Sequence, residues 1–419
     1  FGLEAAVIDP YFGQTAAQAA VENLGRSFSM MMIVLLVAFV FNIVLVLLRK
    51  LTKIRTVFIT GHIMVQQSST ALWIILFCFP QMQDTGIVIL LGLLLGSYWA
   101  VASNLTVEPT QRLTEGGGFG IAHQQMFGIW ATEKIATKMG NSKKDGKKSK
   151  RIEDLQLPGF LSILNENVVA TSILMLVFFG IIIGILGKDL MHEIDPSFAE
   201  TQNFFFYMIS KSFNFAVYVT ILQLGVRMFV NELTESFQGI SNKLLPGSVP
   251  AVDCASVYGF GSPQAITIGF LFGALGQFIA IIGLIVFKSP VFIITGFVPV
   301  FFDNATFAVY ANKSGGLKAA TIIPFASGII QVLGGAFAAW YFGTAQYGGW
   351  HGNFDWDTLW PLFGVIMKNL QYVGLALVIV FLLAIPQIQY RKNKDTYFLL
   401  TEDYAAYLEK TAEKQKTKA

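Results

Sequence analysis

The sequence predicts an all-α, multi-pass membrane protein, and two observations support that fold class. Hydrophobic residues make up 54% of the 419 residues, whereas charged residues make up only 13%. Apolar windows long enough to cross a bilayer recur along the chain, since about 20 apolar residues span a hydrocarbon core roughly 30 Å thick. This composition excludes an ordinary soluble fold, and a net charge of +3 is too small to indicate a nucleic-acid partner.

The apolar windows give the expected spans in order. They cover residues 27–48, 56–79, 85–104, 168–187, 204–230, 265–287, 319–342 and 371–390. Residues 117–130 and 291–310 are also apolar, but Gly, Pro and polar residues interrupt them. We interpret these two segments as re-entrant or broken helices, which a membrane tolerates only where protein or a cavity covers the freed backbone groups.

Basic residues indicate which connections face the cytoplasm. Residues 49–55 are rich in Arg and Lys, and residues 140–158 begin with the run GNSKKDGKKSKR, which predicts a flexible basic linker. Residues 391–419 predict a cytoplasmic tail. The linker separates two halves that each hold one broken segment, as an inverted-repeat transporter would. Because residue 1 is Phe and not an initiator Met, we expect the chain to begin inside a longer gene product.

Polar residues inside the window 56–79 indicate a polar pathway. His62 and Gln66 are four residues apart, so on a helix they share one face. A buried His or Gln costs roughly several kcal/mol unless protein or solute satisfies it. These side chains either line a solute path, which the neighbouring Gln67 favours, or form a hydrogen bond between helices in the bundle core. We predict a transporter with its site in the membrane.

A second polar pair lies in the first broken segment. His123 and Gln124 are adjacent, so they would diverge on a regular helix but can converge where the backbone breaks. The glycine-rich run at residues 116–120 makes such a break plausible. The alternative is a polar loop at the membrane surface.

Asp253 precedes a long apolar window, where an unpaired carboxylate is expensive. It either forms an ion pair with Arg227 or Lys243 or meets the substrate. Its neighbour Cys254 is interpreted as a packing residue, since no basic cluster is evident to activate it. Metal binding is disfavoured because no His, Asp or Glu lies three or four residues from His62 or from the second candidate histidine, and no cofactor is predicted.

Asp303 and Asn304 lie in the second broken segment. They either line the solute path or cap a half-helix.

Several runs of this chain resemble a known family. Residues 55–67, 118–127, 225–230, 245–254 and 302–312 are similar to the EIIC membrane components of ascorbate-specific bacterial phosphotransferase systems. The resemblance extends through essentially the whole chain in order and spacing. Two departures are the absence of the family's N-terminal pair of spans and an unusually lysine-rich linker.

The resemblance implies a homodimeric permease of the bacterial inner membrane, with V-motif and core domains and inverted repeats. Residues 1–139 would form the first half of the core domain, residues 159–250 the V-motif spans of the second half, and residues 251–390 the second half of the core. The permease would take up L-ascorbate while the partner EIIB, itself supplied by EIIA, phosphorylates it. Phosphotransferase activity would arise only together with these partners.

The family's substrate-contacting groups fall on positions that the polar pattern had already indicated: His62, Gln66, His123, Gln124 and Asp253. Asp253 is the candidate catalytic base for the acceptor hydroxyl, although a histidine could take that role. Two alternatives stay open at this point. One is an EIIC component for another sugar or polyol such as galactitol, and the other is an ion-coupled ascorbate or nucleobase carrier without phosphorylation.

Overall fold

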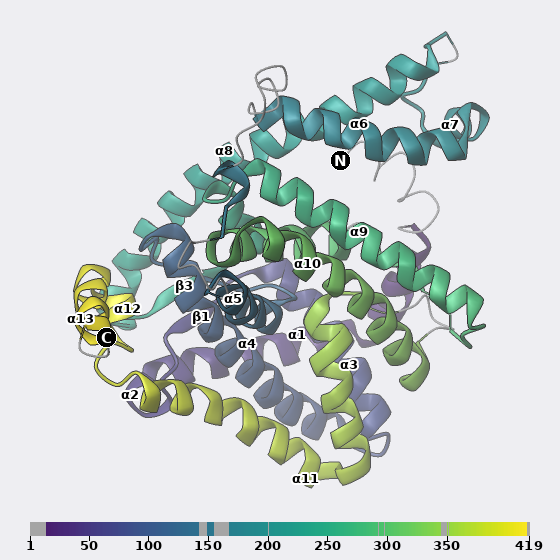
Figure 1. Cartoon of the computed structure of the whole chain (residues 1–419). Coiled ribbons are helices and arrows are strands. Elements are labelled where there is room, and N and C mark those ends of the chain that lie inside the picture. Colours follow the sequence, from purple (N-terminus) through teal and green to yellow (C-terminus); the bar gives the residue numbers. More distant parts are fainter. Residues whose placement is uncertain are drawn as a thin grey trace. The chain divides into compact units, whose positions relative to one another are not determined.

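The computed structural model describes residues 14–141, 149–154, 167–199, 201–291, 293–296, 298–344, 350 and 352–416. The described chain is dominated by helices, which confirms the helical class (Figure 1). It divides into two compact units, each assembled from segments that are distant in sequence. Unit 1 comprises Phe1–Gly25, Ala131–Met228 and Ala255–Thr358, and unit 2 comprises Arg26–Trp130, Phe229–Cys254 and Leu359–Ala419.

Within the described residues, seven helical segments are long and apolar enough to cross a membrane. They lie in α1 (Gln14–Leu47), α4 (Asp84–Thr114), α6 (Asn167–Leu186), α8 (Phe204–Leu244), α9 (Pro263–Val286), α10 (Asn304–Tyr341) and α11 (Phe354–Lys392). Each of these helices covers all, or all but the last residue, of a predicted span. The short α7 (Lys188–Ile194) lies between α6 and α8.

The window 56–79 differs from the expected single span. Its first residues form a strand, β1 (Thr56–Phe58), and the remainder forms α3 (Gly61–Cys78), which is not among the seven segments. The physical reason is the polar run at residues 66–70, which lowers the hydropathy of the N-terminal half of α3.

The interruptions predicted at residues 117–130 and 291–310 are confirmed. Between α4 and α5 (Met126–Asn141) the chain forms turns and the two-residue strand β2 (Gly120–Ile121). Before α10 it forms a π-helical turn, η5 (Pro299–Asp303), and α10 itself breaks at Gly316, where φ is 71°. A Cβ at Gly316 would collide with the Lys150 carbonyl oxygen, so this break requires glycine.

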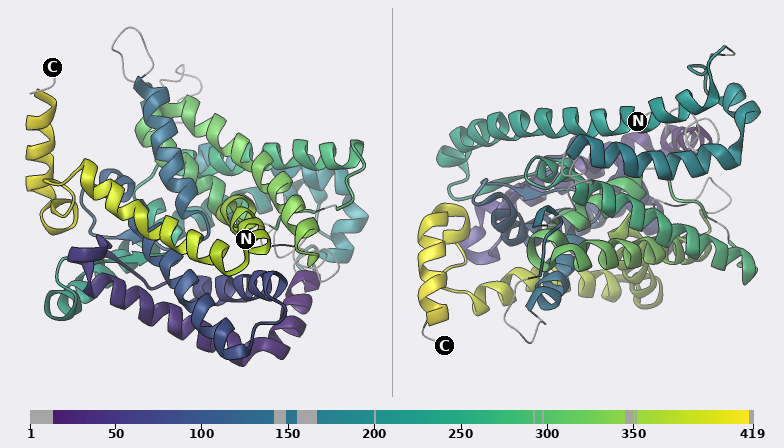
Figure 2. Two further views of the ribbon diagram at one scale, coloured as in Figure 1. Left: turned by 90° about the horizontal axis from the view of Figure 1, so that it is seen from below. Right: turned by 45° about the horizontal axis from the view of Figure 1, so that its top comes forward.

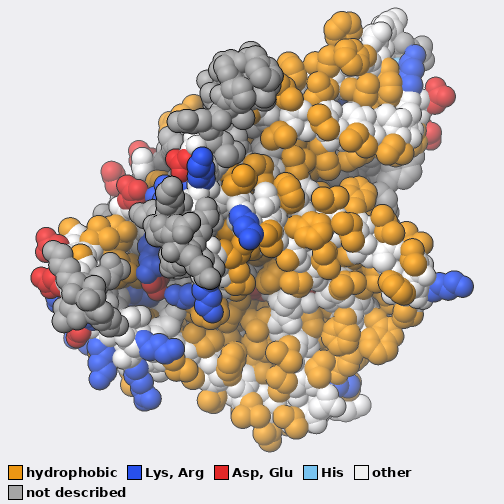
Figure 3. Space-filling view, viewed as in Figure 1, with side chains coloured by type: hydrophobic (Ala, Val, Ile, Leu, Met, Phe, Trp, Pro, Cys, Tyr) orange, Lys and Arg blue, Asp and Glu red, His pale blue; other side chains and the backbone are white. Residues whose placement is uncertain are grey.

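In unit 1, α9 and α10 pack together along most of their length (Figure 2). Glycines make the approach possible, because a Cβ at Gly269, Gly273 or Gly276 would meet α10 directly. The space-filling view shows hydrophobic side chains over both helices (Figure 3). Exposed apolar residues of α9 include Phe278, Ile282 and Ile285, as expected for a surface that faces lipid.

In unit 2, β1, β3 (Val249–Val252) and β2 form a small parallel sheet in the order β1-β3-β2. Thr56 pairs with Val249 and Gly120 pairs with Ala251. The helix α4 packs against β1 and β2 (Figure 1). The sequence did not indicate this sheet, because strands of two to four residues are too short to show an alternating pattern.

The basic connection at residues 49–55, which includes α2 (Arg49–Thr52), packs against the C-terminal tail of unit 2. Arg49 Nη1 lies 2.7 Å from Glu402 Oε1 in α12 (Leu399–Glu402). The Arg55 guanidinium stacks 3.8 Å above the centre of the Tyr397 ring. Charged side chains gather over α12 and α13 (Tyr404–Lys416) (Figure 3). Two of the three segments predicted to be cytoplasmic, residues 49–55 and the C-terminal tail, are therefore in contact.

Of the predicted linker at residues 140–158, residues 142–148 and 155–158 lie outside the described part of the chain. Its described portion includes a 3-10 turn, η2 (Ile152–Asp154).

Candidate functional site

Three titratable side chains follow the three parallel strands of unit 2. Asp253 comes directly after β3, His123 comes two residues after β2, and His62 lies in the first turn of α3, just past β1. Parallel strands bring their carboxyl ends to one edge of a sheet, so these side chains meet there. The amides of Ile59 and Ala122 donate to β3 carbonyls at 3.1 and 2.7 Å, which continues the pairing beyond β1 and β2.

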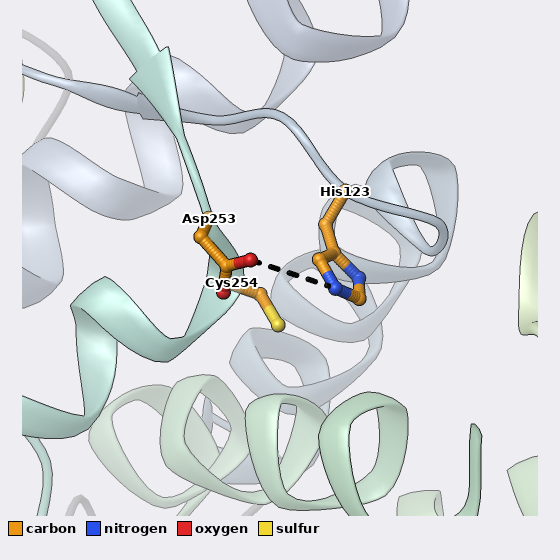
Figure 4. Close-up of side chains that lie close together, drawn as sticks. All are labelled: His123, Asp253 and Cys254. Atoms are coloured by element: carbon orange, nitrogen blue, oxygen red, sulfur yellow. Dashed lines mark ion pairs between the residues drawn. The ribbon is translucent and has the colours of Figure 1, made fainter. Parts of the chain in front are cut away.

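The carboxylate of Asp253 lies between two imidazoles. His62 Nε2 is 3.2 Å from Asp253 Oδ2. His123 Nε2 is 3.9 Å from the same oxygen (Figure 4). Side-chain exposure falls from 65% for His62 to 27% for Asp253 and 3% for His123. The site therefore has an outer rim at His62 and a buried inner wall at His123.

A hydrogen bond to Gln125 orients the His123 ring. Its Nδ1 lies 2.6 Å from the amide oxygen of Gln125. Because an amide oxygen only accepts, Nδ1 is the donor in this contact. The other ring nitrogen, Nε2, is consequently the atom presented to Asp253 (Figure 4).

Four amide and indole groups form a chain beside these residues. Gln124 Nε2 donates to Gln66 Oε1 at 2.9 Å, and Gln67 Nε2 donates to Gln124 Oε1 at 2.9 Å. Gln67 Nε2 also donates to the His123 carbonyl, and Gln67 Oε1 accepts from Trp99 Nε1 at 2.6 Å. Gln67 and Gln124 are both buried, so Gln67 fixes the Gln124 side chain from the protein side, and Gln124 in turn contacts the exposed Gln66.

Two helix N-termini meet at this site. The first N–H groups of α3 and α5 have no intrahelical acceptor, and the dipole of each helix adds positive potential there. Thr60 precedes α3 without a side-chain cap, and its buried hydroxyl has no partner among the described residues. The site therefore suits an anion that also carries hydroxyl groups.

The family follows from comparison with known proteins. Residues 1–358 match the family model of the phosphotransferase-system (PTS) sugar-specific permease component. This chain belongs to that family. The chain is 34% identical over 374 residues to the ascorbate-specific PTS system EIIC component of Mycoplasma pneumoniae. That alignment covers 80% of this chain and 56% of the relative, so the chain spans about half the length of that relative.

Family membership and the seven apolar helices make this chain a multi-pass membrane protein. The predicted resemblance to phosphotransferase-system EIIC components is confirmed.

The folded chain brings together the five site residues predicted from its sequence. His62 and Gln66 both lie on α3, and Gln66 bonds to a turn rather than to another helix of the bundle. His123 and Gln124 are buried within the protein, with only 3% and 1% of their surface exposed, and the alternative of a polar loop at the membrane surface stays a prediction. They lie where the chain turns before α5, which allows these neighbours to reach Asp253 and Gln66 respectively.

Arg227 and Lys243 are the basic partners that the sequence suggested for Asp253. Lys243 is exposed on α8, and the Arg227 side chain lies outside the described residues. Within the described part of the chain, Asp253 forms ion pairs with His62 and His123.

Three residues of this site were not predicted from the sequence to belong to it. Trp99, Gln125 and Cys254 carry no local pattern that distinguishes them from ordinary packing residues. The structure also revises the expectation about metals, since donor atoms of His123, Asp253 and Cys254 lie within 4.8 Å of one another. They come from two separate segments, so a search for ligands three or four residues apart on one helix does not find them.

Asp303 belongs to a different cluster, in unit 1. Its fully buried carboxylate accepts from the backbone amide of Phe354 at 2.7 Å, from Asn353 Nδ2 at 2.9 Å and from Gln331 Nε2 at 2.9 Å. Phe354 is the first residue of α11. Of the two predicted roles, Asp303 has the capping role, and the helix that it caps is α11.

Proposed function

We propose that this permease component binds L-ascorbate and moves it across the bacterial inner membrane, as part of a homodimeric EIIC protein, while EIIB phosphorylates it. One observation carries the proposal. Two imidazoles, one carboxylate and two glutamine amides converge at the N-termini of α3 and α5 in unit 2. The name of the Mycoplasma relative supports the choice of ascorbate.

The charge of the site suits this substrate. Ascorbate is a monoanion near neutral pH and has several hydroxyl groups. The helix N-termini attract the anion, and a protonated His62 would balance the charge of Asp253, so that the carboxylate does not repel the ligand. The amides of Gln66 and Gln124 each offer a donor and an acceptor, which is the combination needed to recognise hydroxyls.

The same geometry suits phosphoryl transfer. A substrate hydroxyl attacks the phosphorus of the EIIB phosphocysteine, so that an O–P bond forms, the S–P bond breaks, and the hydroxyl proton needs an acceptor. We assign that role to Asp253, because its carboxylate is partly exposed at the mouth of the site and His62 holds it at 3.2 Å. Because His123 is buried at the inner wall, it orients the substrate from the opposite side.

A charged surface is available for EIIB. A cavity of about 620 Å³ in unit 2 lies where the basic connection meets the tail helices. Its charged lining consists of four basic residues, Arg55, Arg112, Lys392 and Lys414, and two acidic residues, Glu108 and Glu413. Basic groups at such a surface would steer a phosphorylated, anionic partner and increase its association rate.

Uptake measurements test the proposal. The full-length protein would be reconstituted into liposomes and given labelled ascorbate on one side, with or without phosphorylated EIIB on the other. We expect ascorbate phosphate to accumulate only with EIIB, and unlabelled galactitol to leave uptake unchanged. Accumulation of unmodified ascorbate driven by an ion gradient, without EIIB, would overturn the assignment.

A further inference from the structure

His123, Asp253 and Cys254 form a cluster, here called the His-Asp-Cys cluster, whose members come from two segments of unit 2. His123 belongs to the turn before α5, whereas Asp253 and Cys254 follow β3 (Figure 4). One donor atom from each side chain lies within 4.8 Å of the other two. His62 Nε2 is a fourth donor, 3.2 Å from Asp253 Oδ2.

From this arrangement we infer that the permease component binds a zinc-like divalent cation through the His-Asp-Cys cluster, with His62 as the fourth ligand. Imidazole nitrogen, carboxylate oxygen and cysteine sulfur are the three donor types that Zn²⁺ takes in proteins. The ion would bind reversibly. It would not be a permanent cofactor that transport requires.

The distances from Asp253 Oδ2 to the two imidazole nitrogens are close to those of a tetrahedral zinc site. Bond lengths of about 2.0–2.3 Å place neighbouring ligand atoms roughly 3.3–3.8 Å apart around a tetrahedral zinc ion. Asp253 Oδ2 lies 3.2 Å from His62 Nε2 and 3.9 Å from His123 Nε2, which brackets that range. Cys254 Sγ lies within 4.8 Å of the other two donors of the cluster, whereas His62 is not part of that group, so the exposed His62 side chain must move inward to become the fourth ligand.

The surroundings also support metal binding. The hydrogen bond between His123 Nδ1 and Gln125 Oε1 leaves Nε2 facing the cluster, and such outer contacts commonly orient histidine ligands. A carboxylate and a thiolate together balance the two positive charges of the ion, so little net charge is buried. The Cys254 thiol must lose its proton to solvent when the ion binds.

Competition with the substrate is the expected consequence. Because the cluster shares His123, Asp253 and His62 with the proposed ascorbate site, a bound ion and ascorbate would exclude each other. This consequence rests on the proposed function, whereas binding of the ion itself does not.

The chain offers a matched pair of thiols for the test. Its two cysteines, Cys78 and Cys254, are both buried, and Cys78 Sγ contacts the Gly364 carbonyl instead of the cluster. Purified full-length protein would be titrated with Co²⁺, which reports thiolate ligation by a charge-transfer band in the near ultraviolet. We expect this band in the wild type and in Cys78→Ser, and its loss in Cys254→Ser. Gln125→Leu should weaken Co²⁺ binding by about 10-fold to 100-fold.

If a variant does not fold, a measurement on the wild-type protein still tests the inference. X-ray absorption of the zinc-loaded wild type should show one sulfur at about 2.3 Å among nitrogen and oxygen ligands. A first shell of nitrogen and oxygen alone, or an undiminished charge-transfer band in Cys254→Ser, would overturn the inference. Ascorbate binding measured on metal-free protein from the same preparation keeps the two proposals separate: thiolate ligation by the metal-loaded protein without ascorbate binding by the metal-free protein leaves the metal site standing and refutes the proposed function.

Discussion

Gln67 Nε2 donates a hydrogen bond to Gln124 Oε1 across 2.9 Å, which joins α3 to the turn before α5. Gln67 also accepts from the Trp99 indole of α4, so three segments of unit 2 meet at one buried side chain. The amide of Gln124 is thereby held with its nitrogen toward Gln66. The recognition groups of the proposed site are pre-oriented by a residue that lies behind them.

Gln67→Leu should weaken ascorbate binding although Gln67 lies behind the recognition groups. The substitution leaves the Trp99 indole N–H and the Gln124 amide oxygen without their partner, which costs about 1–3 kcal/mol for each buried group. We expect a loss of affinity of roughly tenfold by calorimetry, with the fold retained. Ser69→Ala on the same helix is the control. Unchanged affinity in Gln67→Leu would show that Gln124 is positioned without it.

Gln66→Ala and Gln124→Ala should each weaken ascorbate binding by roughly 1–3 kcal/mol, because each removes a donor and an acceptor from the site. Equilibrium binding to the purified protein is the measurement. Gln81→Ala, at an exposed turn after α3, should bind as the wild type does. A variant of Gln66 or Gln124 with wild-type affinity would mean that the residue has a packing role only.

Asp253→Asn should separate binding from chemistry. The amide keeps the shape and one acceptor oxygen, so much of the ascorbate affinity should persist, but it cannot accept the hydroxyl proton. We expect phosphorylation-coupled uptake to fall sharply, measured as the rate of ascorbate phosphate formation with EIIB. A variant that unfolds at lower temperature yet phosphorylates at the wild-type rate would contradict the catalytic assignment and leave His62 and His123 as candidates.

Asp303→Ala should destabilise unit 1. Its carboxylate is the acceptor for the Phe354 amide and for Asn353 and Gln331, and each donor left without it costs about 1–3 kcal/mol. Thermal unfolding in detergent should show a clear decrease in melting temperature, and Asp303→Asn should show a smaller one. Asp189→Ala, at an exposed position of α7, is the control. If Asp303→Ala melts with the wild type, the cap is not a stabilising contact.

The loop before α8 should lose stability in acid. Burial opposes ionisation of Asp195, but hydrogen bonds from Lys211 and Tyr207 outweigh it and lower the pKa of Asp195 from 3.8 to about 2. A depressed pKa stabilises the folded state above pH 3.8, and this contribution is lost as the pH falls through about 2. The difference in melting temperature between wild type and Asp195→Asn should therefore shrink across that window. Glu193→Gln, an exposed neighbour, should show no such convergence.

The sequence alone determined the membrane class, most of the spans and the five candidate residues of the site. Hydropathy is a local property, so a window such as residues 168–187 indicates a helix without knowledge of its neighbours. The cost of a polar side chain in a membrane is also local, which is why His62 and Asp253 could be singled out before any contact was known.

Tertiary structure decided which of these residues meet. The pairing of β1, β3 and β2 brings His62, His123 and Asp253 to one edge, and strands of two to four residues carry no periodic signal by which their partners could be recognised. The same applies to Cys254 and to Asp303, whose surroundings come from segments far away in the chain. Sequence spacing predicts neighbours on one helix. It cannot show that an imidazole from α3 and an imidazole from the turn before α5 both meet the carboxylate that follows β3.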